Sequence, residues 1–250
     1  MPLTLLTLLF GAFISVQLTV LFGGERHVLT TAGLTYAGYA RGGFWQLAIV
    51  TGLTLVVLAG AARWAPREER GDRATFRAVL GTLTLLTLLI VASALLRMQV
   101  YIDTYGLTRL RLLVACCEVW FGVILLLILV AGIRVRASWL PRAAIAVGVL
   151  ALIGLAVANP DLRIAQNQLN RPADRIDPYY LSTLSPDAVP ALAGMADPDD
   201  RACVLRRISL DLGENEWREW NLGRAAARDL IGENAGPADP HRCVSRDRGY

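Results

Sequence analysis

Five long apolar runs, separated by polar breaks, occupy the first 160 residues of the chain. A helix needs about 20 apolar residues to cross the roughly 30 Å hydrocarbon core of a bilayer. Each run reaches that length, which predicts five membrane-spanning helices. The predicted spans are Leu3–Phe22, Phe44–Ala62, Phe76–Leu96, Leu112–Ile133 and Trp139–Ala158.

Residues 161–250 follow a different pattern, being polar, charged and rich in proline. Ser185 and Asp197 are each followed directly by proline, an order typical of helix starts. No strand-like alternation of apolar and polar residues is present. We therefore predict an all-α protein, with a polytopic transmembrane helical domain over 1–160 and a small, soluble helical tail over 161–250.

The composition supports a membrane protein, since apolar residues make up 54%, charged residues only 18%, and the mean hydropathy is +0.45. These values are high for a soluble domain. Every basic residue is arginine, and the formal net charge of +4 does not indicate nucleic-acid binding. We expect the lipid bilayer, and no nucleic acid, as a partner.

The arginines also predict the orientation of the spans. Eight lie in the connections on the N-terminal side of the membrane and five in the short connections on the other side. The eight are Arg63, Arg67, Arg70, Arg73, Arg77, Arg134, Arg136 and Arg142, and the five are Arg26, Arg41, Arg97, Arg109 and Arg111. Because short cytoplasmic loops carry the excess of positive residues, we expect a cytoplasmic N-terminus and an extracytoplasmic C-terminal tail.

Two cysteines, Cys203 and Cys243, lie in the tail. An extracytoplasmic compartment permits disulfides, so we predict a bond between these two residues. Such a bond would close a loop of about forty residues and stabilise the tail by roughly 3–4 kcal/mol.

Common catalytic signatures are absent from the sequence. It has no phosphate-binding loop ending in lysine, no G-x-S-x-G, no H-E-x-x-H and no C-x-x-C. The two histidines, His27 and His241, are far apart and offer few ligands for zinc. We expect no metal and no cofactor, and these observations favour a non-catalytic protein over an enzyme.

Polar and aromatic residues gather near the connections that we expect to face outward. Their arginines suit an anionic headgroup or a carboxylate, although they could equally tie loops together, and the tyrosines could form an interfacial belt. The candidate cluster comprises Tyr36, Tyr39, Arg41, Arg97, Tyr101, Asp103, Tyr105, Arg109, Arg111 and Glu118.

Part of this cluster has helical spacing, since Arg97, Tyr101, Tyr105 and Arg109 are each four residues apart. An unbroken helix would align them on one face. Gly106 interrupts the segment, and we expect it to bend or end the helix.

Glu118 lies about 15 Å along the fourth predicted span, if that helix begins near Thr108. A carboxylate at that depth should face protein or water and have a partner. We expect it to face the helix bundle near an arginine or the tyrosine-bearing connections. It would then be a structural salt bridge or a protonated acid, or else a group that handles a ligand or a proton.

Four segments carry a family resemblance. They resemble the bacterial membrane family DUF4173, which is close to DUF4153 and is a domain of unknown function. The segments are GLTYAGYARGGFWQL, RMQVYIDTYGLTRLRL, NPDLRIAQNQLNR and YYLSTLSPDAVPAL. The resemblance implies a polytopic bacterial membrane protein and brings no reaction with it.

This sequence departs from the usual pattern of the family in two respects. The family usually has further N-terminal spans, so this chain corresponds to its C-terminal half. It would be a truncated member, a fragment, or one product of a split gene whose N-terminal membrane half is a separate partner. The family often has an acidic residue where this sequence has Gly38, which would impair a site built on that loop.

Two functions remain open at this stage. The first is a non-catalytic accessory, sensory or assembly component of a membrane. The second is a transporter component or lipid-modifying enzyme that handles a lipid or solute with the outer Tyr/Arg cluster and Glu118.

Overall fold

The computed structural model describes residues 36–64, 70–134, 138–212 and 221–234, with a few helical positions before residue 16. Within these residues every regular element is a helix, which confirms the all-α prediction.

The chain divides into two compact units. The first contains Met1–Tyr105 and Leu113–Leu152, and the second contains Gly106–Leu112 and Ile153–Tyr250. The short connection Gly106–Leu112 thus folds with the C-terminal residues. The predicted boundary at residue 160 between a membrane domain and a soluble tail stays a prediction, because compactness does not show where a bilayer would end.

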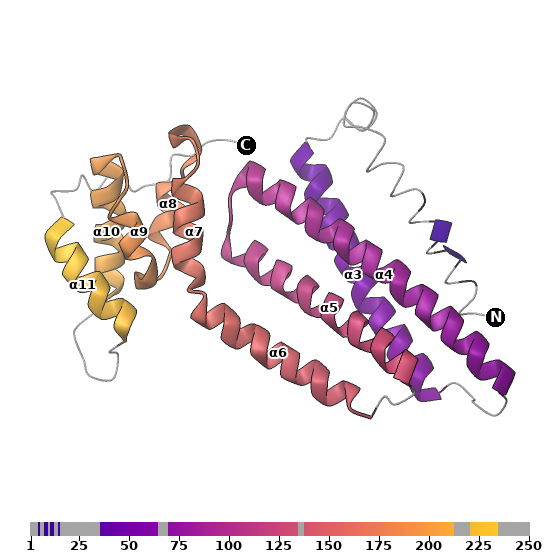
Figure 1. Ribbon diagram of the computed structural model, residues 1–250. Coiled ribbons are helices and arrows are strands. Elements are labelled where there is room, and N and C mark those ends of the chain that lie inside the picture. Colours follow the sequence, from indigo (N-terminus) through magenta and orange to yellow (C-terminus); the bar gives the residue numbers. More distant parts are fainter. Residues whose placement is uncertain are drawn as a thin grey trace. The chain divides into compact units, whose positions relative to one another are not determined.

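Four helices follow one another from residue 36 to residue 157 (Figure 1). They are α3 (Tyr36–Trp64), α4 (Arg70–Tyr105), α5 (Arg109–Arg134) and α6 (Leu140–Val157). Each contains a stretch long and apolar enough to cross a membrane. The chain is therefore a multi-pass membrane protein, and these helices correspond to four of the five predicted spans. The remaining predicted span, Leu3–Phe22, lies mostly outside the described residues.

The third predicted span is longer than the apolar run indicated. The apolar run ends at Leu96, whereas we expected Gly106 to bend or end the helix, and α4 continues to Tyr105 in agreement with that expectation. Gly106 then ends the helix in the left-handed conformation, with φ of 80°, which glycine adopts without steric cost. The polar residues after Leu96 continue the helix, because no glycine or proline occurs before Gly106.

Helices α3 and α4 pack against each other through buried threonines. Thr51 and Thr54 on α3, and Thr84 and Thr87 on α4, are at most 2% exposed. Each hydroxyl donates to the carbonyl four residues earlier, over 2.7–3.0 Å. Their polar atoms are thus satisfied within their own helix, and the small side chains permit close helix packing.

Helix α5 contacts α4 and α6 through glycines. A Cβ on Gly122 would lie 3.3 Å from Val91 Cγ1 on α4, and a Cβ on Gly148 of α6 would lie 3.2 Å from Trp120 Nε1 of α5. The Trp120 indole N–H also donates to the Ala144 carbonyl, at 3.1 Å.

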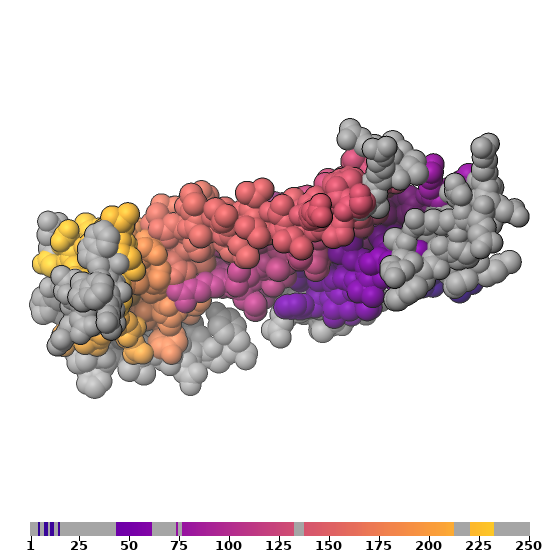
Figure 2. All heavy atoms as spheres, turned by 90° about the horizontal axis from the view of Figure 1, so that it is seen from below, coloured from indigo at the N-terminus to yellow at the C-terminus, as the bar shows by residue number. Residues whose placement is uncertain are grey.

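The rest of α6 is exposed. None of its residues is buried, and Figure 2 shows the helix on the surface of the molecule. Its outward side chains include Ile145, Val149, Leu150 and Leu152. A helix this apolar and this exposed suits contact with lipid.

The second unit consists of short helices around one apolar core. They are α7 (Pro160–Leu169), η1 (Ala173–Arg175), α8 (Pro178–Ser182), η2 (Pro186–Ala188), α9 (Val189–Leu192), α10 (Pro198–Asp211) and α11 (Leu222–Asn234). The core includes Ile164, Leu181, Leu192 and Leu205, none of which has solvent-exposed surface. Within the described part of residues 161–250 every regular element is a helix, as we expected of the tail.

The predicted helix starts and the predicted disulfide have different outcomes. Asp197 caps α10 as expected, by accepting from the backbone N–H groups of Asp199 and Asp200. Ser185 stands at the start of η2, but its side chain makes no capping bond.

Cys203 is buried and disulfide-bonded. Its expected partner, Cys243, lies outside the described residues, so that pairing stays a prediction.

The contact between Gly148 and Trp120 gives a first prediction. Gly148→Leu should force the indole away from α6 and lower the free energy of unfolding by about 1–3 kcal/mol, the usual cost of overpacking. Gly154→Leu is the matched control, since nothing lies within 4 Å of a Cβ there. Thermal unfolding in detergent compares the two variants. Equal melting temperatures would contradict this contact.

Candidate functional site

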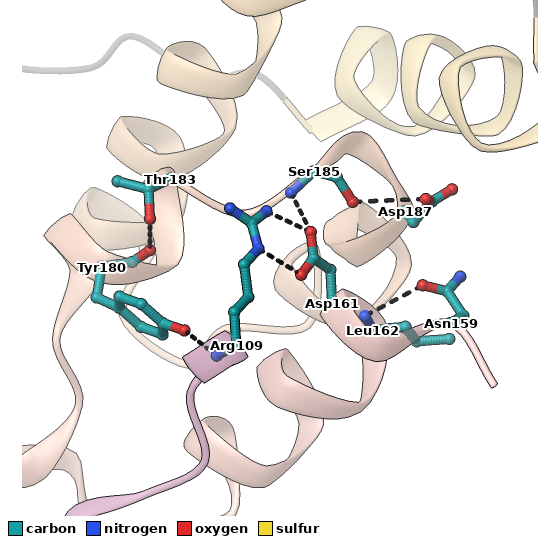
Figure 3. Close-up of polar contacts among 8 residues, drawn as sticks. All are labelled: Arg109, Asn159, Asp161, Leu162, Tyr180, Thr183, Ser185 and Asp187. Carbon is teal, nitrogen blue, oxygen red and sulfur yellow. Dashed lines mark hydrogen bonds and ion pairs between the residues drawn. The ribbon is translucent and has the colours of Figure 1, made fainter. Parts of the chain in front are cut away.

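Three segments that are distant in the sequence meet at one polar cluster (Figure 3). Arg109 begins α5, Asp161 lies in the first turn of α7, Tyr180 lies in α8, and Ser185 follows α8. All four belong to the second unit. They come from three of the four segments that carry the family resemblance.

The centre of the cluster is an ion pair between Arg109 and Asp161. Arg109 Nε donates to Asp161 Oδ1 at 2.8 Å, and its terminal NH2 nitrogen donates to Oδ2. The backbone N–H of Ser185 donates to the same Oδ2, also at 2.8 Å. The Asp161 side chain is 9% exposed and that of Arg109 is 47% exposed. Such a bidentate pair fixes the orientation of both groups.

These contacts keep Asp161 ionised. Burial alone would raise the pKa of Asp161, but hydrogen bonds from the Arg109 side chain and from Ser185, together with the positive charge of Arg109, lower it below its ordinary value. The first turn of α7 also favours negative charge, because helix N-termini carry unpaired N–H groups.

Local sequence explains why Asp161 occupies this place. Asn159 adopts a left-handed conformation, with φ of 48°, and its side chain accepts from Leu162 N at 3.3 Å. Pro160 then starts α7, as proline commonly does at the first helical position. The Asn-Pro-Asp sequence therefore sets the helix start and places Asp161 directly after it.

Tyr180 holds the backbone at Arg109. Its hydroxyl oxygen accepts from the Arg109 backbone N–H at 3.1 Å. Asp177 caps α8 by accepting from Tyr180 N at 3.2 Å, which anchors the helix that carries the tyrosine. Both the backbone and the side chain of Arg109 are thus bound by the second unit.

Leu107, two residues before Arg109, is also bound through its backbone. Leu107 N donates to Asn167 Oδ1, and Gln168 Nε2 donates to the Leu107 carbonyl, both at 2.9 Å. A Cβ on Gly106 would lie 2.5 Å from Gln168 Oε1, so this position requires glycine. Leu107 and Leu112 pack against the core of the second unit.

We call these side chains the clamp. Its members are Asn167, Gln168, Asp161, Tyr180 and Arg109, together with the Ser185 backbone N–H. Within the clamp, Asn167 and Gln168 bind the backbone of Leu107, and Tyr180 binds the backbone of Arg109. Each oxygen of Asp161 accepts at least one hydrogen bond. Among the described residues no group of three or more His, Cys, Asp or Glu could hold a metal. The polar groups of the clamp bond to one another and to backbone.

The predicted cluster is distributed over both units. Arg97, Tyr101, Asp103 and Tyr105 lie on α4 in the first unit, where the Tyr101 and Tyr105 rings are 5.1 Å apart. Arg109 and Arg111 belong to the second unit, and the Arg111 side chain donates to the Gly106 carbonyl. Tyr36, Tyr39 and Arg41 lie on α3, and their side chains are outside the described part.

Sequence analysis missed four residues that bind Arg109 or Leu107, namely Asp161, Asn167, Gln168 and Tyr180. They lie in the segments NPDLRIAQNQLNR and YYLSTLSPDAVPAL, which the family resemblance had drawn attention to. A usable signal was the Asn-Pro-Asp helix start, which places a carboxylate in the first turn of a helix.

Glu118 is separate from the clamp and lies on α5 in the first unit. The residue is 1% exposed, which confirms that it faces the helices rather than lipid. Neither carboxyl oxygen accepts a hydrogen bond from any described residue. The arginine partner that we expected is therefore not seen in this part of the chain.

Comparison with protein families places the chain in one whose function is unknown. A family model described as a domain of unknown function, DUF4153, matches residues 1–195. No curated protein and no solved structure matches the chain. The matched range contains the whole clamp as well as Glu118.

The lowered pKa of Asp161 predicts an acid-sensitive second unit. An unfolded aspartate has a pKa of about 3.9, and the folded value is lower, so ionised Asp161 stabilises the fold above about pH 4. This contribution is lost as the pH falls through the folded pKa. Melting temperatures measured from pH 6 to pH 2 should fall more steeply for the wild type than for Asp161→Asn.

An exposed aspartate provides the control for this experiment. Asp229→Asn on α11 should retain the acid dependence of the wild type. Identical pH profiles for the wild type and Asp161→Asn would show that the ion pair does not set the acid stability of this unit.

Proposed function

The chain belongs to the DUF4153 family, and from that premise we propose that it is a non-catalytic accessory or assembly component of a membrane. In this role the clamp holds the connection between two membrane helices as part of the helical C-terminal unit. A rigid connection of this kind would present a fixed surface to another membrane component.

One observation supports this proposal above the others. The polar groups of the clamp bond to one another and to backbone, and each oxygen of Asp161 already accepts a hydrogen bond within the protein. Binding and catalytic sites instead expose convergent polar groups to a cavity. The arrangement favours a structural role for the arginine-bearing connection over headgroup binding.

We further infer a bacterial cell membrane as the location, with the N-terminus in the cytoplasm and the C-terminal unit outside. The arginine bias of the short connections supports this orientation. A closer relation to DUF4173, and a separate N-terminal membrane half as partner, belong to the same proposal and rest on the resemblance of the four segments.

A second candidate function is the handling of a lipid or solute. The observation in its favour is Glu118, a buried acid whose oxygens accept no hydrogen bond among the described residues. Unpaired ionisable groups inside membrane spans commonly belong to ion or substrate pathways.

A deletion strain separates the two functions. The accessory role predicts unchanged lipid and metabolite inventories, with a changed abundance or assembly state of another membrane protein in quantitative membrane proteomics and native gels. A single lipid or solute class that accumulates in the deletion, and returns to normal with the wild-type gene, would contradict it and support the second candidate.

The clamp can be tested by a double-mutant cycle. Arg109→Gln and Asp161→Asn should each lower the free energy of unfolding by about 1–3 kcal/mol, since each leaves a partner unsatisfied. The double variant should cost clearly less than the sum, because the two groups act on each other. Thermal unfolding in detergent provides the measurement.

The exposed Arg206 on α10 supplies the control for the cycle. Arg206→Gln should leave stability unchanged and should combine additively with Asp161→Asn. Additive behaviour of Arg109→Gln and Asp161→Asn would refute the clamp.

The orientation gives a further prediction. Alkaline phosphatase fused after Tyr250 should be active, because it folds outside the cytoplasm, whereas green fluorescent protein fused at the same point should stay dark. A bright fluorescent fusion with inactive phosphatase would reverse the proposed orientation.

A further inference from the structure

Glu118 combines two properties that do not fit an ionised carboxylate. The residue is 1% exposed and lies inside the apolar stretch Arg109–Gly132. Both carboxyl oxygens of Glu118 are buried, and neither accepts a hydrogen bond from a described residue. Buried charges in proteins are otherwise paired or hydrogen-bonded.

The neighbouring contacts of α5 show which helix this side chain faces. Gly122, one turn later on the same face, lies against Val91 of α4. Trp120 is two residues on, about 200° around the helix, and contacts α6 through the Ala144 carbonyl. Glu118 therefore points toward α4, on the opposite side of α5 from α6.

Few titratable or charged groups are available near this face. The apolar stretch of α3, Phe44–Ala61, contains none, and α6 carries one, Arg142, on the far side of α5. Closer to its N-terminus α3 also carries Tyr36, Tyr39 and Arg41, whose side chains lie outside the described part. The other groups near this face are on α4 and α5, and none of the described groups donates a hydrogen bond to Glu118. They are Arg97, Tyr101, Asp103 and Tyr105 on α4, and Arg109, Arg111, Cys116 and Cys117 on α5.

The buried hydroxyl groups of the first unit do not solvate the carboxyl group either. Thr84 and Thr87 of α4 donate to the carbonyls of Leu80 and Leu83 in their own helix. Thr51 and Thr54 of α3 do the same with Leu47 and Val50. Each hydroxyl hydrogen is thereby used, and none remains to stabilise an anion.

An ionised carboxylate in this place would be costly. Insertion scales give roughly 2.5–3.5 kcal/mol for a charged side chain at the centre of a membrane helix, and larger values apply without water or a partner. Binding one proton removes the charge and leaves an uncharged acid, whose burial costs much less.

We propose that Glu118 is a proton-binding site within the membrane helices, and that its carboxyl group carries a proton at neutral pH. The ligand class is the proton itself, and the site is independent of the clamp and of the proposed accessory role. Release of the proton would place an unpaired charge against α4. Proton binding is thus coupled to the packing of α4 and α5.

Infrared spectroscopy of the protein in lipid bilayers at pH 7 tests the proposal. Wild-type protein should show the carbonyl stretch of a protonated carboxylic acid, and Glu118→Gln should lose that band without losing a carboxylate band. Asp103→Asn is the matched control, since Asp103 is an exposed acid on α4. It should lose a carboxylate band and keep the protonated one.

A measurement on the wild type alone covers the case in which Glu118→Gln does not fold. With the glutamate carboxyl carbons labelled with ¹³C, the protonated carbonyl band should shift with the label at pH 7. Exclusively ionised glutamate carboxylates in the labelled wild type would overturn the proposal, and so would a Glu118→Gln difference spectrum that contains only carboxylate bands.

Discussion

The bidentate pair between Arg109 and Asp161 is the interaction on which the arrangement of the second unit depends. It joins the first residue of α5 to the first turn of α7, which are 52 residues apart in sequence. Ser185 and Tyr180 add their bonds to the same two residues, and Asn167 and Gln168 bind the backbone just before them. The connection after α4 is thereby part of a folded core rather than a loose loop, which accounts for its unusual content of polar residues.

The two units satisfy their polar groups by different means. In the first unit the buried threonines bond within their own helices, so α3 and α4 can pack without donors from elsewhere. In the second unit the polar side chains bond between segments and fix their relative positions. Glu118 fits neither arrangement, because it is buried and its carboxyl oxygens accept no hydrogen bond from a described residue. In the proposed protonated state the carboxyl group carries no charge, which removes the largest part of the cost of burying it without a partner.

The sequence predicted the fold class and four of the spans because twenty-residue apolar runs have few alternative structures. The helix end came from Gly106, which was expected to bend or end the helix, and not from the apolar run that stops at Leu96, since hydropathy marks where lipid contact ends and not where a helix ends. It included Arg109 as a candidate but missed Asp161, because a single sequence does not show contacts between distant segments. It predicted the burial of Glu118 from the cost of a charge in lipid, whereas the arginine partner expected from the same argument is not seen among the described residues.

Hydrogen–deuterium exchange of the amides in Gly106–Leu112 tests the central claim, that the clamp makes this connection part of the second unit. The backbone N–H groups of Leu107 and Arg109 donate to Asn167 and Tyr180, so they should exchange slowly in the wild-type protein. Asp161→Asn should speed exchange in this segment and around Ser185, while amides in the middle of α3 and α4 stay protected. Fast exchange of Leu107 and Arg109 in the wild type, or protection unaffected by Asp161→Asn, would contradict the account.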